Sequence, residues 1–234
     1  MITALFMGWT DPITQSWFPI RKMSLTAAGY RTCYVNGVFQ AIDVSPNMRL
    51  LFDKGLIKPD EIKISQEIPS LFAQRLPISR PEDAIKELEF FDLNRPLDPI
   101  VFGARSGGYS ITDGYDLFPE ITADPTGDYH FYFLARNLNK AGTSIHRYID
   151  SLSVGMVLEF DWNGYLTHGN IVLGKLPGYL VDVVRCDLPI EVEVAKINSK
   201  VGWNYYHLLC HATVRLKPFT ETKYQLALET VLAT

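Results

Sequence analysis

The fold of this chain is decided by residues 130–180, which read HFYFLARNLNKAGTSIHRYIDSLSVGMVLEFDWNGYLTHGNIVLGKLPGYL. Three short runs in this stretch alternate apolar with polar side chains, namely Phe131, Phe133 and Ala135, then Met156, Leu158 and Phe160, then Ile171 and Leu173. A period of two residues is typical of strands with one buried face, and Gly and Asn turns separate the runs. The stretch therefore predicts several short strands that form a small β-barrel.

Three motifs in this stretch resemble the HIRAN domain, a family found alone in bacteria and at the head of helicase-like repair proteins. The motifs are Phe133-Leu134-Ala135-Arg136-Asn137, Leu152-x-x-Gly155-x-x-Leu158, and Leu173-Gly174-x-Leu176-Pro177 followed by Tyr179-Leu180. The resemblance implies a small OB-like barrel that binds DNA. The family's Asn-Pro-aromatic-Asp loop, which helps to bind a DNA end in better-known relatives, is replaced here by a direct turn at residues 161–165.

The resemblance and the residue types together suggest a set of nucleic-acid contacts. We expect phosphate contacts from Arg136 and Lys175, hydrogen bonds to bases or sugars from Asn137 and Asn163, and stacking surfaces from Trp162, Tyr165 and Tyr179. These side chains are expected to line a mouth of the barrel that accepts an unpaired polynucleotide without catalysing a reaction.

A later strand, predicted over residues 203–216, adds two further candidates. One of its faces is mostly apolar and is expected in the core. The other face carries Trp203, Tyr205 and His207, which suit base stacking and phosphate contact. The alternative is that this face packs on a helix or on the other domain, and the composition does not separate the two.

The first half of the chain predicts a small sheet with short helices. Residues 17–25 and 30–35 form an expected hairpin, and an Asn-Gly turn leads into an expected strand at Val38–Ala41. A helix is expected after Ser45, with Met48, Leu51 and Phe52 on its inner face. The apolar run at residues 100–103 is expected to be a buried strand.

The order of several elements in this half also resembles a bacterial family that joins such a half to a HIRAN-like half. The elements are Trp9-x-Asp11-Pro12, Trp17-Phe18-Pro19-Ile20, Tyr30 with Tyr34-x-x-Gly37, Leu71-Phe72-Ala73-Gln74-Arg75 and Ser79-Arg80-Pro81. The hairpin is also similar to the small N-terminal subdomain of HipA-type kinase toxins. The fold class expected is therefore α+β and β-rich, with an N-terminal α+β domain over residues 1–125 and a HIRAN-like β-barrel domain over residues 126–234.

Charge and composition limit the kind of partner. The net charge of −4 argues against binding nucleic acid through overall charge. The excess of acidic residues falls within residues 1–126, so a nucleic-acid site is expected in the second half, as a local patch. Three scattered cysteines fit buried thiols in a reducing cytoplasm. No apolar run is long enough for a membrane span, and no signal peptide is expected.

Catalytic, metal and cofactor motifs are not found in the sequence. His207-x-x-Cys210-His211 carries possible zinc ligands, but on a strand Cys210 points away from both histidines. The Gly-rich residues 103–113 lack the Gly-Lys-Ser/Thr ending of a phosphate-binding loop, so a flexible connection is favoured. We therefore expect no catalysis, no metal and no cofactor.

The sequence leaves two functions in view. The first is a cytoplasmic accessory protein of bacterial DNA repair or genome defence that binds single-stranded DNA or a duplex end and serves a helicase, nuclease or kinase. The second is a protein-interaction module, toxin/antitoxin-like or a complex subunit, without nucleic-acid binding. The acidic first half and the missing family loop support the second function.

Overall fold

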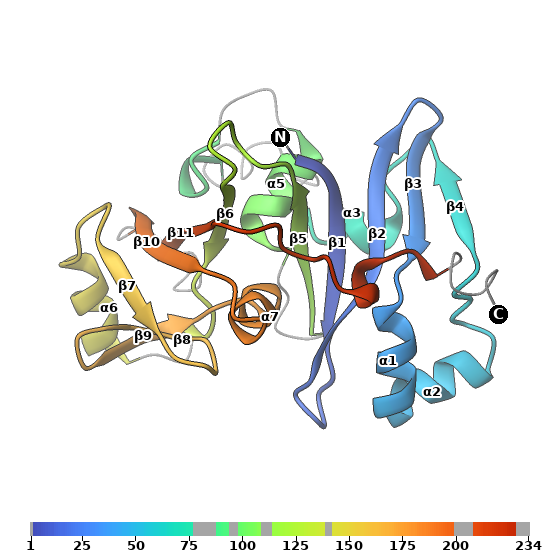
Figure 1. The fold of residues 1–234 in the computed structure, drawn as a ribbon, viewed down its shortest axis with the longest axis horizontal. Coiled ribbons are helices and arrows are strands. Elements are labelled where there is room, and N and C mark those ends of the chain that lie inside the picture. The colour runs from blue at the N-terminus through green and yellow to red at the C-terminus, as the bar shows by residue number, and fades with distance from the viewer. Residues whose placement is uncertain are drawn as a thin grey trace. The chain divides into compact units, whose positions relative to one another are not determined.

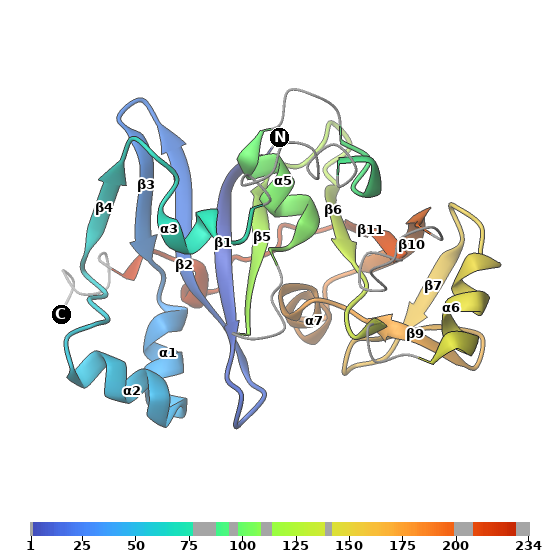
Figure 2. The ribbon, with the colours of Figure 1, turned by 180° about the vertical axis from the view of Figure 1, so that it is seen from behind.

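The computed structural model describes residues 2–76, 88–93, 98–108, 114–138, 142–198 and 208–227. The chain forms two compact units, of which the first contains Met1–Leu76, Gly108–Ile121 and Phe219–Thr234 and the second contains Pro77–Gly107 and Thr122–Pro218. Each unit is built on an antiparallel sheet with short helices (Figure 1 and Figure 2), so the protein is a strand-rich α+β protein, as predicted. In contrast to the expected ranges 1–125 and 126–234, each unit is assembled from segments that are separated in the sequence.

The first unit contains a five-stranded antiparallel sheet in the order β4-β3-β2-β1-β5. Its strands are β1 (Ile2–Thr10), β2 (Trp17–Thr26), β3 (Gly29–Tyr34), β4 (Ile62–Ser65) and β5 (Tyr115–Ile121). The hairpin predicted from the two apolar runs is β2 with β3. A single-turn helix, α3 (Ser70–Ala73), contributes the buried Phe72.

Residues 219–227, the last that the structure describes, belong to this first unit. Phe6 and Phe118, on the neighbouring strands β1 and β5, stack with their ring centroids 5.1 Å apart. Phe219 packs edge-on against Phe118 at 5.3 Å, and Tyr224 lies 6.0 Å from Phe6. Residues 219–227 therefore complete an aromatic core whose other members, Phe6 and Phe118, come from β1 and β5.

Helix α1 (Gly37–Val44) occupies the place where a strand was predicted, so the prediction for Val38–Ala41 is wrong. Val38, Ala41 and Ile42 are all buried, and their spacing of three and four residues is that of one helix face. The four residues assigned to a strand are too few to show this period. The helical assignment becomes visible only when Ile42 is included.

Helix α2 (Pro46–Asp53) begins at Ser45, as predicted. The Ser45 hydroxyl accepts a hydrogen bond from the backbone N–H of Met48 at 3.4 Å, which is the ordinary N-cap contact. Met48 is buried, as expected, but Leu51 and Phe52 are both more than one third exposed. The prediction that these two side chains face the core is therefore wrong.

Asp11 is a buried carboxylate directly after β1. Its Oδ2 accepts hydrogen bonds from the backbone N–H and the hydroxyl of Thr14, at 2.9 and 2.8 Å, and its Oδ1 accepts the Ser45 hydroxyl at 3.0 Å. Burial alone would raise the pKa of Asp11, but these hydrogen bonds together outweigh burial and hold the pKa below its ordinary value. The carboxylate thus connects the end of β1 to the cap of α2.

Helix α5 (Pro99–Ser106) replaces the buried strand predicted at residues 100–103, and that prediction is also wrong. The Asp98 carboxylate accepts a hydrogen bond from the backbone N–H of Ile100 at 2.8 Å, and Pro99 occupies the first turn. Gly107 ends the helix in the left-handed conformation, with φ of 69°. These start and stop signals define a helix although its apolar run has the composition of a strand.

The second unit contains a six-stranded antiparallel sheet in the order β6-β11-β10-β7-β8-β9. Its strands are β6 (Tyr129–Leu134), β7 (Val157–Phe160), β8 (Tyr165–His168), β9 (Ile171–Lys175), β10 (Ile190–Ile197) and β11 (Leu208–Val214). The three alternating runs predicted as strands are β6, β7 and β9. Two helices belong to this unit, α6 (Thr143–Asp150) between β6 and β7 and α7 (Gly178–Arg185) between β9 and β10.

One face of this sheet is filled by large apolar side chains. They are Phe131, Phe133, Leu158, Leu166, Leu173, Val192, Val194, Cys210 and Ala212, all buried. The register places them on the same face, since Phe133 is opposite Cys210 and Val192 is opposite both Ala212 and Leu158. We call this the inner face and the opposite one the outer face.

The two edges of the sheet meet at one point, just beyond the end of β6. The backbone N–H of Arg136 donates to the Lys175 carbonyl at 2.8 Å, and that of Lys175 donates to the Arg136 carbonyl at 3.1 Å. Lys175 is the last residue of β9, the opposite edge strand. This bridge makes the sheet a half-barrel whose edges touch. Gly174 permits the approach, because a Cβ there would lie 2.9 Å from the Arg136 carbonyl oxygen.

Replacement of Asp11 by Ala should lower the free energy of unfolding by about 1–3 kcal/mol, because the Ser45 hydroxyl and the Thr14 amide lose a buried acceptor. The folded-state pKa is lowered, so the stabilisation is present above about pH 4 and is lost as the pH falls through the folded-state value. Urea denaturation near neutral pH and near about pH 3 measures both effects. If the difference in the free energy of unfolding between wild type and variant were equally large at both pH values, Asp11 would not be ionised in the folded protein.

Replacement of Gly174 by Ala should lower the free energy of unfolding by about 1–3 kcal/mol, because the added methyl group forces the Arg136–Lys175 bridge apart. Gly142 provides a matched control, since its φ is −72° and a Cβ there would meet nothing nearer than Ser144 Oγ at 3.9 Å. Gly142→Ala should cost at most about 1 kcal/mol. Equal losses in urea denaturation of the two variants would show that the bridge is not sensitive to the side chain at position 174.

Candidate functional site

Three of the predicted contact residues lie in one row across two strand pairings. Tyr165 on β8 is directly opposite Lys175 on β9, and Lys175 is directly opposite Arg136 across the bridge. Residues directly opposite in antiparallel pairs project from the same face of a sheet. Leu166 is buried on the inner face and is opposite Gly174, so the next pair along the two strands, Tyr165 with Lys175, lies on the outer face, and Arg136 lies there with Lys175. A register shift beyond Leu166 leaves Leu173 without a directly opposite residue. We call Tyr165, Lys175 and Arg136 the cationic row.

The cationic row is accessible to a ligand. The Tyr165 side chain is 44% exposed, and both Arg136 and Lys175 are half-buried. The Lys175 ammonium lies 5.1 Å from the centre of the Tyr165 ring, within the range of a cation–π contact. The row therefore presents two positive charges and one aromatic ring to the solvent.

A tight turn carries the predicted contacts Trp162 and Asn163 beside this row. Asp161 Oδ1 accepts the backbone N–H groups of Asn163 and Tyr165, at 2.9 and 2.8 Å, which fixes the turn between β7 and β8. The Gly164 carbonyl then accepts the N–H of Leu176 at 2.7 Å, so the turn is bonded to the chain just after β9. Trp162 is 60% exposed, and Asn163 is exposed.

Asn137 lies next to Arg136, immediately beyond the bridge. Its backbone has φ of 67°, a left-handed conformation that Asn tolerates better than most residues. The side chain is exposed. Six of the predicted contact residues, Arg136, Asn137, Trp162, Asn163, Tyr165 and Lys175, are thus gathered around the closure of the half-barrel. The other two that were predicted on a strand, Tyr205 and His207, lie outside the described residues.

Tyr179 does not offer a stacking surface, and that prediction is wrong. Its side chain is 1% exposed, and its ring lies 5.9 Å from Phe131 in the core. The spacing of Tyr179 from the Gly174-x-Leu176-Pro177 motif does not show that α7 turns the ring inward. The prediction that these side chains line an open mouth of the barrel is also wrong. The inner face of the sheet is filled by apolar side chains, and the candidate surface lies on the outer face.

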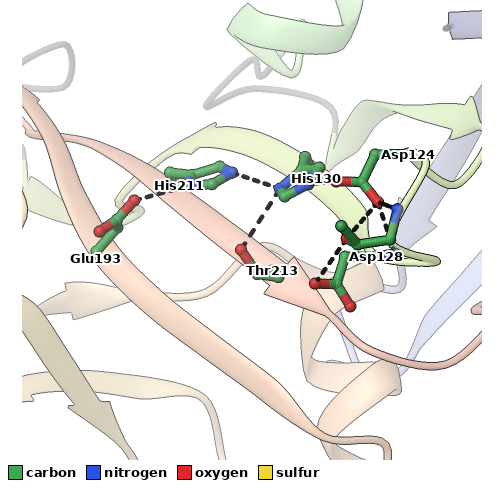
Figure 3. A network of polar contacts seen from close by, with 7 residues as sticks. Asp124, Asp128, His130, Glu193, His211 and Thr213 are labelled. Atoms are coloured by element: carbon green, nitrogen blue, oxygen red, sulfur yellow. Dashed lines mark hydrogen bonds and ion pairs between the residues drawn. The ribbon is translucent and has the colours of Figure 1, made fainter.

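A second group of polar residues lies elsewhere on the outer face, on β6, β10 and β11, and was not predicted (Figure 3). Glu193 Oε1 lies 2.8 Å from His211 Nδ1, and His211 Nε2 lies 3.1 Å from His130 Nδ1. His130 Nε2 in turn lies 3.1 Å from Asp124 Oδ2. We call Asp124, His130, His211 and Glu193 the histidine chain.

The carboxylate at one end of the histidine chain is held by a turn. Asp124 accepts the Thr126 hydroxyl at 2.7 Å and the backbone N–H of Asp128 at 3.0 Å. The Thr126 hydroxyl, then the His130 ring, then the Asp128 amide hold the pKa of Asp124 well below its ordinary value. Asp124 is therefore an anion throughout the neutral range, facing His130.

The sequence could not reveal the histidine chain because its two histidines are 81 residues apart. They become neighbours only because β6 pairs with β11, with Thr213 opposite His130 and Tyr132 opposite His211. The one available signal was the alternation in β6, which places His130 and Tyr132 on the face opposite Phe131. Without the strand order, the sequence shows His130 only as an isolated histidine.

Within the part of the chain that the structure describes, no three His, Cys, Asp or Glu side chains are arranged to hold a metal ion. Cys210 lies on the inner face, where burial raises the pKa of its thiol, while the neighbouring His211 lies on the outer face. Among the same residues, no helix is both long and apolar enough to cross a membrane. Comparison with family models, curated proteins and solved structures finds no match to this chain.

The buried position of Tyr179 gives a direct test of the difference between core and surface. Tyr179→Ala should lower the free energy of unfolding by about 3–5 kcal/mol, the range for large core aromatics. Tyr165→Ala, on the exposed cationic row, should change it by less than about 1 kcal/mol. Urea denaturation of the two variants measures the contrast. Similar small losses in both would show that Tyr179 is not a core residue.

Proposed function

We propose that the protein binds nucleic acid, with DNA in single-stranded form or at a duplex end as the expected ligand, through the cationic row and the adjoining Trp162 turn. The observation that carries the proposal is the row itself. Three residues chosen from the sequence for their chemistry, Arg136, Tyr165 and Lys175, are opposite one another on one exposed face. That the half-barrel is a HIRAN-like, OB-like barrel is part of this proposal and rests on the sequence motifs.

The chemistry of this surface suits an unpaired strand. Arg136 and Lys175 would bind phosphates, and the planar guanidinium allows a two-point contact. Trp162 and Tyr165 would stack on bases, and each stacked base is worth about 1–3 kcal/mol without sequence preference. Asn137 and Asn163 would hydrogen-bond a base edge or a sugar hydroxyl. Two stacked bases would offset the unfavourable net charge of −4.

The role proposed for such a protein is that of an accessory factor in bacterial DNA repair or genome defence. It would hold exposed DNA for a helicase, nuclease or kinase, in the cytoplasm. The binding surface uses side chains that stack and pair with phosphates and needs no catalytic group. This role rests on the resemblance of the motifs and on the surface together.

A second candidate function is protein interaction, and one observation favours it. Between residues 50 and 64 the first unit exposes six large apolar side chains, Leu50, Leu51, Phe52, Leu56, Ile62 and Ile64. These side chains lie on α2, on the segment after it and on β4. Large exposed apolar surfaces mark interaction sites. Such a surface is compatible with a partner enzyme that uses the DNA held by the second unit.

Binding of fluorescent single-stranded, 3′-recessed and duplex oligonucleotides at two salt concentrations tests the proposal. Trp162→Ala should raise Kd for the single strand about 5- to 150-fold, the equivalent of one lost stack. Arg136→Ala should weaken binding for all sequences and reduce the slope of log Kd against log salt by about 1. Both effects should be seen by fluorescence anisotropy.

The matched control is Arg49→Ala, which removes an exposed arginine of α2 that pairs with Asp43 in the first unit. This variant should bind as the wild type does. No binding of any oligonucleotide by the wild type would overturn the proposal and leave protein interaction as the function. Equal weakening by Arg49→Ala and Arg136→Ala would show a diffuse charge effect instead of a site.

A further inference from the structure

The histidine chain contains more hydrogen-bond contacts than two neutral histidines can supply. Three contacts link Glu193, His211, His130 and Asp124, at 2.8, 3.1 and 3.1 Å, and each needs one hydrogen between its two heavy atoms. A neutral imidazole carries one N–H, so two neutral rings supply only two hydrogens. If both were given to the carboxylates, the lone pairs of His211 Nε2 and His130 Nδ1 would face each other at 3.1 Å.

We propose that His130 and His211 form a binding site for one additional proton, shared between His130 Nδ1 and His211 Nε2 and held by the carboxylates of Asp124 and Glu193. The pair then carries one positive charge between two negative ones. All three contacts become hydrogen bonds, and the two terminal ones are strengthened because the donors belong to a cation. The proposal is independent of nucleic-acid binding.

The geometry of the rings fits a shared proton. The two ring planes are inclined by 18° and the ring centroids lie 5.2 Å apart, so the 3.1 Å N–N contact runs nearly along the line that joins the two rings, the direction in which lone pairs and N–H bonds point. The Thr213 hydroxyl lies 3.5 Å from His130 Nδ1, at the limit of a hydrogen bond, and does not replace the ring contact. Figure 3 shows the four residues in a line across β10, β11, β6 and the turn before β6.

The charged groups around the pair favour a cation overall. Asp124 and Glu193 contact the rings directly, Asp128 belongs to the turn that holds Asp124, and Glu191 is opposite Thr213 on the outer face. Three described cations lie on or near these strands: Lys196 of β10, whose ammonium donates to the Glu89 carbonyl, Arg215 directly after β11, and Arg105 of α5. Of these, Arg105 is connected to the pair through an aromatic ring. It stacks 3.3 Å above the Tyr132 ring, which in turn stacks on His211 at 4.6 Å. One positive charge, separated from His211 by an aromatic ring, is opposed by two carboxylates in contact.

The shared proton fastens one turn to the sheet. Asp124 starts the turn at residues 124–128, which directly precedes β6, and its contact with His130 is the first link of the chain. Below the range in which imidazoles lose their proton, all three hydrogen bonds are present. When the pair releases the third hydrogen at higher pH, two lone pairs oppose each other. Asp124 remains ionised, so the turn loses one of its attachments to the sheet.

The histidine ring nitrogens of the full chain can be followed by long-range nitrogen–proton NMR correlations over the neutral pH range. Near pH 6 we expect three of the four nitrogens of His130 and His211 to carry a proton, and both rings should change together as the third proton is lost. His168, whose Nδ1 contacts the Tyr148 hydroxyl at 2.7 Å, serves as an internal reference. Two protons on the pair near pH 6, one on each ring, would overturn the proposal.

Glu193→Gln provides a second test, because the amide oxygen still accepts the His211 N–H but the negative charge is gone. The difference in melting temperature between the wild type and this variant should be about 2–4 °C larger near pH 6 than near pH 8.5. This is the shift expected for one hydrogen bond in a chain of this size. His168→Gln is the matched control and should keep the wild-type difference. Identical pH dependence of wild type and Glu193→Gln would contradict a proton held between the two carboxylates.

Discussion

The second unit depends on two backbone hydrogen bonds between Arg136 and Lys175. An open sheet of six strands leaves the polar groups of both edge strands unpaired, and a bridge between the edges satisfies part of them. The bridge also decides where side chains point. It aligns the cationic row on the outer face, and it brings the Trp162 turn against the end of β9 through the Leu176–Gly164 hydrogen bond. Gly174 is the local requirement, since no larger residue leaves room for the Arg136 carbonyl.

The strands of this protein could be predicted from the sequence where a buried face repeats every second residue, as in β6, β7 and β9. Two helices could not, because short helices and buried strands share the same apolar composition. At α5 the deciding information lay in the flanking Asp98 and Gly107, and at α1 in the spacing of Ile42 from Val38. Local signals are present in both places, but a window of four residues is too short to show the helical period.

The candidate surface shows the same division between local and distant information. Arg136, Lys175 and Tyr165 could be chosen from residue type and motif, yet only the strand register shows that they form one row. Tyr179 has the right chemistry for stacking, but the helix that carries it turns the ring into the core. The histidine chain lay beyond any local pattern, because its members come from three segments of the chain that are joined by pairing. The net charge of −4 does not locate the row, since a compact row of two cations is possible in an acidic protein.

The return of residues 219–227 to the first sheet has a consequence for how the protein is made. Phe6 and Phe118 lie in strands that leave the ribosome early, whereas Phe219 and Tyr224, which cover them, are synthesised after the whole second unit. The second unit can thus finish folding while the aromatic cluster of the first is still bare. During translation, the first sheet leaves this apolar aromatic surface exposed for the time needed to add about a hundred residues, at roughly 5–20 residues per second. Chaperones that bind exposed apolar surface should therefore bind the nascent chain at the first sheet.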